Sequence, residues 1–297
     1  TLHDFLVRRL GRGAGEMFAP LMARGVYAAS SKDLSVRTAF PRLWSMDRAK
    51  GLLRSMASQS AAGITSLPDG LGHLPAEFSK VLSSEVRYLQ RVDRLEYKDN
   101  EWVAQTPQES YSAKQLILAV PAQVAAVLLR TSGHELGALI GSIRHSELSN
   151  VQLGYFGIEA PPGFGFLVHP DAGGETLGCV YASQVNAGCA PSGAALLSCM
   201  VGPSEDPVAS AKSTLVQALD WSGEPDMVHV TEYPFGIPLY DRHQDRLRQA
   251  IEKRLHDFQG LQLAGNYLRG VSVESSLQSG RRAAELILKS SNTRQVA

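Results

Sequence analysis

The fold is decided by the segment Leu261-Gln262-Leu263-Ala264-Gly265-Asn266-Tyr267-Leu268-Arg269-Gly270-Val271-Ser272-Val273-Glu274. Its apolar start predicts a buried strand that ends at Gly265, and a helix is expected to open near Val271. The unpaired N–H groups and positive dipole end of such a helix attract a phosphate or a partly anionic ring oxygen. Gly265 and Gly270 would let the backbone approach a ligand closely. The pattern fits a ligand-binding turn and a plain strand–loop–helix corner about equally.

The rest of the chain alternates predicted helices and strands, which indicates an α/β fold. Helical spacing of apolar residues predicts an initial hairpin turning at residues 11–15, a helix after Pro121, and helices over 72–82, 208–219, 244–258 and 279–288. Strands are predicted at 86–89, 92–97, 102–105, 115–120 and 227–233, with a turn at Asp99-Asn100. The charge-poor, glycine-rich stretch 148–201 predicts a distinct lobe on an antiparallel sheet, with strands at 151–156, 166–168, 177–181 and 196–201.

The composition is that of an ordinary globular protein. Of 297 residues, 44% are hydrophobic and 20% charged, and no stretch approaches the roughly 20 consecutive apolar residues of a membrane span. The three cysteines form no metal-ligand pattern, so no metal is expected. The first 60 residues carry ten Lys/Arg against four Asp/Glu, a net of +6, and the remainder carries 19 against 25, a net of −6. Such a basic end fits an anionic lipid surface, nucleic acid or an ordinary solvated face.

Several motifs together resemble the protoporphyrinogen oxidase family. The segment Gly265-Asn266, followed by Gly270-Val271-Ser272-Val273 and Ser279-Gly280-Arg281, is similar to the family's C-terminal flavin segment. The likeness runs from residue 1 to about 288 and includes Asp4-Phe5, Arg8-Arg9-Leu10-Gly11, Gly25-Val26-Tyr27-Ala28, Leu67, Gly70-Leu71, Leu74-Pro75, Ile237-Pro238, Tyr240 and His243. The chain departs from the family pattern at Leu239, Arg242 and Glu274-Ser275.

The resemblance implies binding roles for particular residues. Val92 would meet the adenine of FAD, and Tyr233 stands where the family has a tryptophan against the flavin. The remaining residues implied to bind FAD are Gly265, Asn266, Gly270, Val271, Ser272 and Val273. A tetrapyrrole pocket would be lined by Phe164, Gly165, Leu167 and Met200. Taken alone, Phe164 and Met200 are more typical of core positions than of a ligand site.

One family feature is missing from these 297 residues, the Gly-x-Gly-x-x-Gly turn after a strand that cradles the FAD pyrophosphate. We therefore expect the C-terminal part of an oxidase, which alone would bind FAD poorly. The expected parts are a helical membrane-facing segment at 1–60, an incomplete FAD-binding domain at 61–120 and 225–290, and a mostly antiparallel substrate-binding lobe at 121–224.

The resemblance implies FAD-dependent oxidation of protoporphyrinogen IX to protoporphyrin IX. A hydride would pass from a meso carbon to flavin N5, proton loss and tautomerisation would follow, and dioxygen would reoxidise the flavin to give hydrogen peroxide. The cycle would repeat until the macrocycle is aromatic. No side-chain nucleophile or acid–base pair stands out, which fits chemistry carried by a cofactor. Coproporphyrinogen III as substrate, another flavin amine oxidase activity and a non-catalytic remnant are the alternatives. Peripheral attachment at the cytoplasmic face of a bacterial membrane is expected, with no nucleic-acid partner and with a homodimer as one form of assembly.

Overall fold

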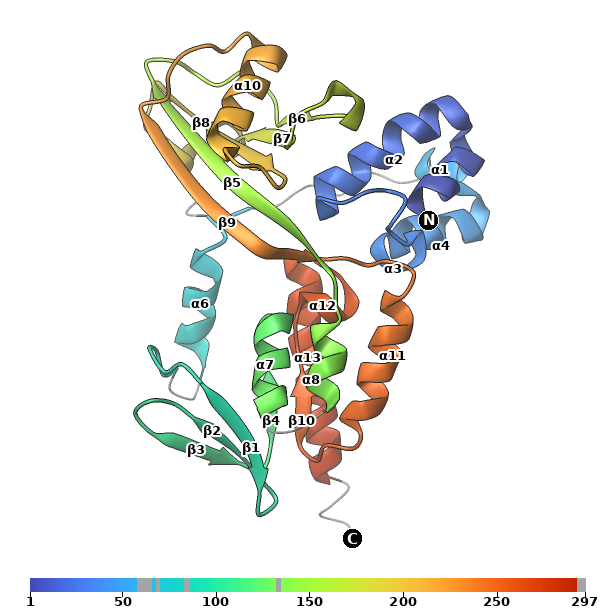
Figure 1. Cartoon of the computed structure of the whole chain (residues 1–297), viewed down its shortest axis with the longest axis vertical. Coiled ribbons are helices and arrows are strands. Elements are labelled where there is room, and N and C mark those ends of the chain that lie inside the picture. The colour runs from blue at the N-terminus through green and yellow to red at the C-terminus, as the bar shows by residue number, and fades with distance from the viewer. Residues whose placement is uncertain (58–65, 68–69, 83–85, 132–134, 293–297) are drawn as a thin grey trace. The chain divides into compact units, whose positions relative to one another are not determined.

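The computed structural model describes residues 1–57, 66–67, 70–82, 86–131 and 135–292, and its chain packs as two units (Figure 1). The first unit contains residues 1–36, 42–86 and 146–237, and the second contains 37–41, 87–145 and 238–297. The α/β fold class is confirmed. The division into membrane-facing, FAD-binding and substrate-binding parts remains a prediction.

The first unit begins with the predicted helical hairpin, α1 (Leu2–Leu10) and α2 (Arg12–Tyr27). Thr1 caps α1 in a capping box with Asp4, and Gly11 turns the chain with a φ of 83°. Gly15 lies so close to the backbone of Val7 that a Cβ would collide with it, which lets the two helices touch. The first unit continues with α4 (Pro41–Lys50), α5 (Leu52–Ala57) and α6 (His73–Val81), whereas α3 (Val36–Ala39) lies almost entirely in the stretch 37–41 that belongs to the second unit.

The predicted antiparallel lobe is a five-stranded sheet of order β6-β7-β8-β5-β9. Its strands are β5 (His145–Phe156), β6 (Gly165–Leu167), β7 (Thr176–Tyr181), β8 (Ala194–Val201) and β9 (Met227–Pro238). The β5–β8, β6–β7 and β7–β8 pairings are antiparallel. Helix α10 (Pro207–Leu219) contributes Ala211 and Leu215 to the core with alternate residues of β5 and β8, because successive strand side chains face opposite ways. The short elements η1 (Pro170–Ala172), α9 (Ala182–Val185) and η2 (Ala187–Cys189) connect the strands.

The second unit joins a small meander to a parallel strand pair covered by helices. Strands β1 (Arg94–Lys98), β2 (Glu101–Gln105) and β3 (Ser110–Ala113) are antiparallel, and β4 (Leu116–Leu118) pairs in parallel with β10 (Leu261–Leu263). Asp99 and Asn100 form the predicted turn, both with positive φ. The helices are α7 (Ala122–Thr131), α8 (Glu135–Gly141), α11 (Gln244–Leu255), α12 (Asn266–Arg269) and α13 (Val273–Asn292).

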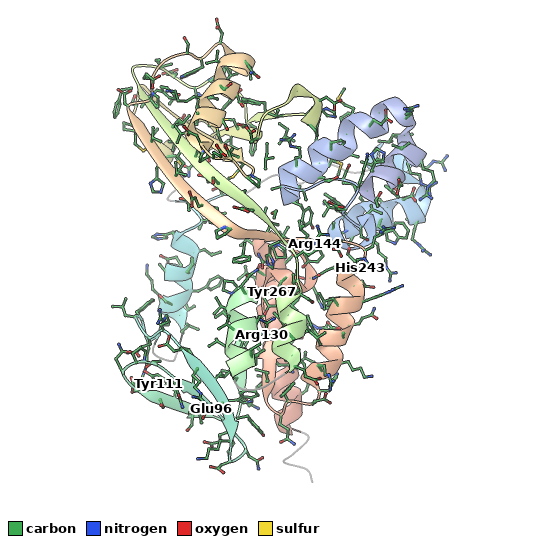
Figure 2. The ribbon with its side chains drawn as sticks, viewed as in Figure 1. Glu96, Tyr111, Arg130, Arg144, His243 and Tyr267 are labelled. Carbon is green, nitrogen blue, oxygen red and sulfur yellow. The ribbon has the colours of Figure 1, made fainter. Side chains whose placement is uncertain are left out.

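Close helix packing shapes the core of the second unit. A Cβ on Gly137 of α8 would lie 2.7 Å from the Ala126 carbonyl oxygen of α7 and 3.0 Å from the Arg130 side chain, so only glycine allows this approach. Figure 2 shows Arg130 beside these two helices. Trp102, Leu129 and Tyr267 are fully buried in the same core.

One local prediction was wrong, and two short elements were missed. Residues 86–89 form no strand: Leu89 has a φ of 58° and a side chain that is 96% exposed. Strand β3 was not predicted, and the turn after β10 contains the one-turn helix α12. Among the described helices, none is both long and apolar enough to cross a membrane.

Candidate functional site

One candidate site, in the second unit, is the loop that leaves β10 and reaches α13 through α12. Gly270 has a φ of 140°, and a Cβ there would lie 2.6 Å from the Ser275 hydroxyl. A Cβ on Gly265 would lie 2.6 Å from the Tyr267 ring. Both positions therefore need glycine, for space as well as for backbone conformation. The six predicted residues Gly265, Asn266, Gly270, Val271, Ser272 and Val273 all lie in this segment, and the helix predicted to open near Val271 begins at Val273.

Side chains from α11, α13 and the segment before α11 hold this loop in place. The Tyr240 hydroxyl accepts a 2.6 Å hydrogen bond from the Gly270 N–H and donates a 2.7 Å bond to the Asn266 carbonyl oxygen. The Ser279 hydroxyl accepts from the Gly265 N–H at 3.1 Å, and the Gln244 amide donates to the Tyr267 carbonyl oxygen at 2.7 Å. Burial raises the pKa of the Tyr240 hydroxyl, which keeps it protonated and able to donate. The protein alone therefore fixes the path of the loop.

The start of α13 offers backbone donors to a ligand. The Ser272 hydroxyl accepts from the Ser275 N–H at 3.1 Å and so caps the helix. Within the part of the chain that the structure describes, the N–H groups of Val273 and Glu274 have no protein acceptor. These donors and the positive dipole end favour a partly anionic group, such as the carbonyl edge of a flavin ring.

A separate candidate site is a cavity of about 600 Å³ in the first unit. It lies against α2, β6 and β7, and its lining is mostly apolar. All four residues predicted to bind a tetrapyrrole line it: Phe164, Gly165, Leu167 and Met200. The structure thus brings together residues from two separate stretches of the chain.

Several apolar side chains that line this cavity are exposed to solvent and are not buried in the core. Phe164 is 54% exposed and Leu167 is 51% exposed, which rules out an ordinary core role for them. Gly178 gives β6 room, since a Cβ there would lie 2.6 Å from the Phe166 carbonyl oxygen. A Cβ on Gly25 of α2 would lie 3.1 Å from the Leu167 side chain, so glycines on two sides shape the wall.

The two remaining predicted residues lie in different units. Val92 precedes β1 in the second unit and packs against the core cluster that contains Leu95 and Trp102. Tyr233 lies on β9 in the first unit with 45% of its surface exposed. Their roles toward adenine and flavin remain predictions.

Several residues at these places received no role from the sequence. Tyr240, Gln244 and Ser279 position the glycine loop, and Arg24 lines the apolar cavity. Tyr240 and Ser279 fall in motifs of the resemblance, which signalled them without assigning a contact. Across the described residues, no group of three His, Cys, Asp or Glu side chains could hold a metal ion.

Comparison with known proteins gives consistent matches over nearly the whole chain. The family model for flavin containing amine oxidoreductases matches residues 2–288. The chloroplastic protoporphyrinogen oxidase of Oryza sativa subsp. japonica is 25% identical over 97% of this chain, and that of Bos taurus is 27% identical over 97%. The chain spans 64% of the rice protein's length and 69% of the cattle protein's length.

One solved structure supports the fold. A protein from Exiguobacterium sp. 255-15, described as a candidate protoporphyrinogen oxidase, superposes with a TM-score of 0.82 at 21% identity. The alignment covers 97% of this chain and 67% of that one. At this identity the likeness establishes the shared fold, because one fold hosts many activities.

Proposed function

Because the chain belongs to the family of flavin containing amine oxidoreductases, we propose that it takes part in the FAD-dependent oxidation of protoporphyrinogen IX to protoporphyrin IX, with dioxygen as acceptor. Family membership confirms the expected flavin cofactor, FAD, and the general class, an oxidoreductase. The particular substrate and acceptor are the proposal.

The observation that carries the proposal is the shared position of Phe164, Gly165, Leu167 and Met200 on one apolar cavity. Its volume of about 600 Å³ lies within the usual range of small-molecule sites. Exposed aromatic and aliphatic side chains suit an apolar tetrapyrrole macrocycle. The curated relatives in rice and cattle are both named protoporphyrinogen oxidases, which supports the same proposal.

The glycine loop fits one edge of the cofactor. Gly265 and Gly270 allow close approach of the backbone, and the N–H groups of Val273 and Glu274 would donate to the ring's carbonyl edge. Tyr240 and Ser279 hold that arrangement, and when bound, FAD would supply the hydride acceptor. The 297 residues contain no glycine-rich pyrophosphate cradle, so we expect weak FAD affinity from these residues alone.

The test starts from the gene. The coding region upstream of Thr1 is sequenced, and the product of the whole reading frame is purified and its visible spectrum recorded. With protoporphyrinogen IX we expect rising porphyrin fluorescence, oxygen uptake and hydrogen peroxide. Coproporphyrinogen III, amines and carotenoid precursors are assayed in parallel.

Each rival predicts a different result in these assays. If coproporphyrinogen III, an amine or a carotenoid precursor is oxidised faster than protoporphyrinogen IX, that compound is the substrate and the proposal for protoporphyrinogen IX is wrong. A product that carries no flavin even with added FAD would favour the non-catalytic remnant.

Peripheral membrane attachment and a homodimer belong to the same proposal. The basic first 60 residues support a membrane-facing role, as do Met17 and Phe18 of α2, each more than half exposed. Flotation with anionic vesicles at low and high salt tests attachment, since an electrostatic contribution weakens with salt. Light scattering of the same sample gives the number of chains, and a single-chain mass would remove the homodimer.

A further inference from the structure

A second, polar cavity adjoins the apolar one in the first unit. It also measures about 600 Å³ and lies between α1, α2, the segment after α2 and η1. Arg24, Ala28 and Leu177 line both cavities, so these residues form the boundary between them. An apolar space beside a polar one fits an amphipathic ligand.

Arg24 is the charged group at that boundary. Its guanidinium donates a 3.2 Å hydrogen bond to the Thr176 carbonyl oxygen, and among the described residues it has no carboxylate partner. A guanidinium has five N–H donors, so most of its capacity is left for a ligand. Partial burial lowers the pKa of Arg24, a sign that the cation is desolvated without compensation from an anion.

The other charges of the polar cavity leave it favourable to anions. The Glu16 carboxylate pairs with Arg12 at 3.0 Å, and Asp171 lies 3.5 Å from the His169 ring. Lys32 also lines this cavity, and its ammonium has no carboxylate partner in the described ranges. The Glu16 charge is offset by Arg12, and the Asp171 side chain is 91% exposed to solvent. Arg24 and Lys32 are therefore the charges left to meet an anion in this cavity.

We propose that Arg24 binds a carboxylate of an amphipathic substrate whose apolar body occupies the cavity lined by Phe164 and Leu167. The assignment rests on the proposed function for the identity of that body: a porphyrinogen is an apolar tetrapyrrole macrocycle, puckered at its sp3 meso carbons, with propionate side chains. Arg24 would thereby set the orientation of the macrocycle. A planar guanidinium suits this task because it can hold a carboxylate through two parallel hydrogen bonds.

The test compares acids with their esters. Calorimetric titration of the full chain, in one dilute detergent buffer, uses protoporphyrin IX and its dimethyl ester, and palmitic acid and its methyl ester. The unmodified chain should bind each acid roughly ten-fold or more tightly than its ester, as expected for charge-assisted hydrogen bonds. In Arg24→Met this preference should fall to about one while ester affinity is unchanged, and Arg24→Lys should restore part of it.

Arg8→Met is the matched control, because Arg8 is an exposed arginine of the same unit that lines neither cavity. It should keep the preference for acids, and circular dichroism shows whether each variant is folded.

An unchanged preference in folded Arg24→Met, or no preference in the unmodified chain for either ligand pair, overturns the assignment. If Arg24→Met loses its fold, Arg24→Lys decides: a preference equal to that of the unmodified chain overturns the assignment, and a partial loss supports it. A preference for palmitate that depends on Arg24, without any porphyrin binding, supports Arg24 as the carboxylate site and removes the porphyrinogen proposal instead.

Discussion

At the scale of single residues, the Tyr240 hydroxyl joins the two ends of the glycine loop. Tyr240→Phe removes a group that is 2.6 Å from the Gly270 nitrogen and 2.7 Å from the Asn266 oxygen, leaving a partly buried donor and acceptor unpaired. We expect the free energy of unfolding to fall by about 1–3 kcal/mol, measured by urea denaturation. Tyr97→Phe is the control, since no hydrogen bond of that hydroxyl is found in the described part of the chain. Equal stability of the two variants would show that Tyr240 does not hold the loop.

The role of a single residue could be predicted from the sequence where the backbone geometry allows only one residue type. Contacts that depend on tertiary packing could not be predicted. Gly270 was predicted to allow close approach, and its φ of 140° shows why glycine is needed there. Arg24 carries no local signal, because an arginine on a helix reads as a solvated charge. Only the fold places it beside β7, where it bonds to Thr176.

At the scale of elements, the strand errors arose because the sequence does not show which strands pair, although the strand propensity of the residues was judged correctly. Residues 86–89 contain valine and tyrosine, which favour strands, but they form no strand in the structure. This segment instead makes a side-chain contact, in which the Arg87 guanidinium lies 5.0 Å from the Tyr111 ring centroid. Strand β3 is polar and gives no alternating pattern, yet it forms because Ser112 aligns with Val103 of β2. A strand exists only where a neighbour supplies its hydrogen bonds, which local sequence cannot show.

Two glycines, one just before α13 and one in its body, give the element-scale prediction. Gly270→Ala places a methyl group 2.6 Å from the Ser275 hydroxyl at a φ of 140°, so it should destabilise the protein by more than about 1 kcal/mol. Gly280→Ala meets no atom within 4 Å inside a helix and should stabilise it by about 0.5–1 kcal/mol. Thermal denaturation measures both. Stabilisation by Gly270→Ala would contradict the tight turn that leads into the helix.

At the scale of the whole molecule, the sequence predicted the classes of structure but not how the chain divides. Each unit is assembled from three separate stretches, and residues 37–41 and 87–145 pack with the C-terminal residues 238–297. The antiparallel lobe was visible because four strands of its sheet follow one another between His145 and Val201, and only β9 (Met227–Pro238) comes later in the chain. The parallel pair β4–β10 joins residues more than 140 positions apart, and only the family resemblance could suggest it.

Buried tyrosines in both units give the whole-molecule prediction, a loss of stability at alkaline pH. Burial raises the pKa of Tyr155 to about 12 and also raises the pKa values of Tyr240 and Tyr267. The unfolded chain releases these protons near pH 10 and the folded chain only at higher pH, so the stability present below about pH 10 falls as pH rises toward 12. Each such tyrosine contributes a slope of up to about 1.4 kcal/mol per pH unit, measured by urea denaturation between pH 9 and 11.5.

Tyr155→Phe separates this effect from general alkaline damage. The variant keeps the ring that lies 5.2 Å from the Trp221 ring but has no proton to lose, so its stability should depend less steeply on pH. Tyr88→Phe, at a position that is 70% exposed, should leave the slope unchanged. If the unmodified protein and both variants lose stability with the same pH slope, the alkaline loss does not arise from Tyr155. The folded protein would then have to accommodate an ionised Tyr155 in the sheet core. Burying an unpaired charge there is costly, which is why we expect the slopes to differ.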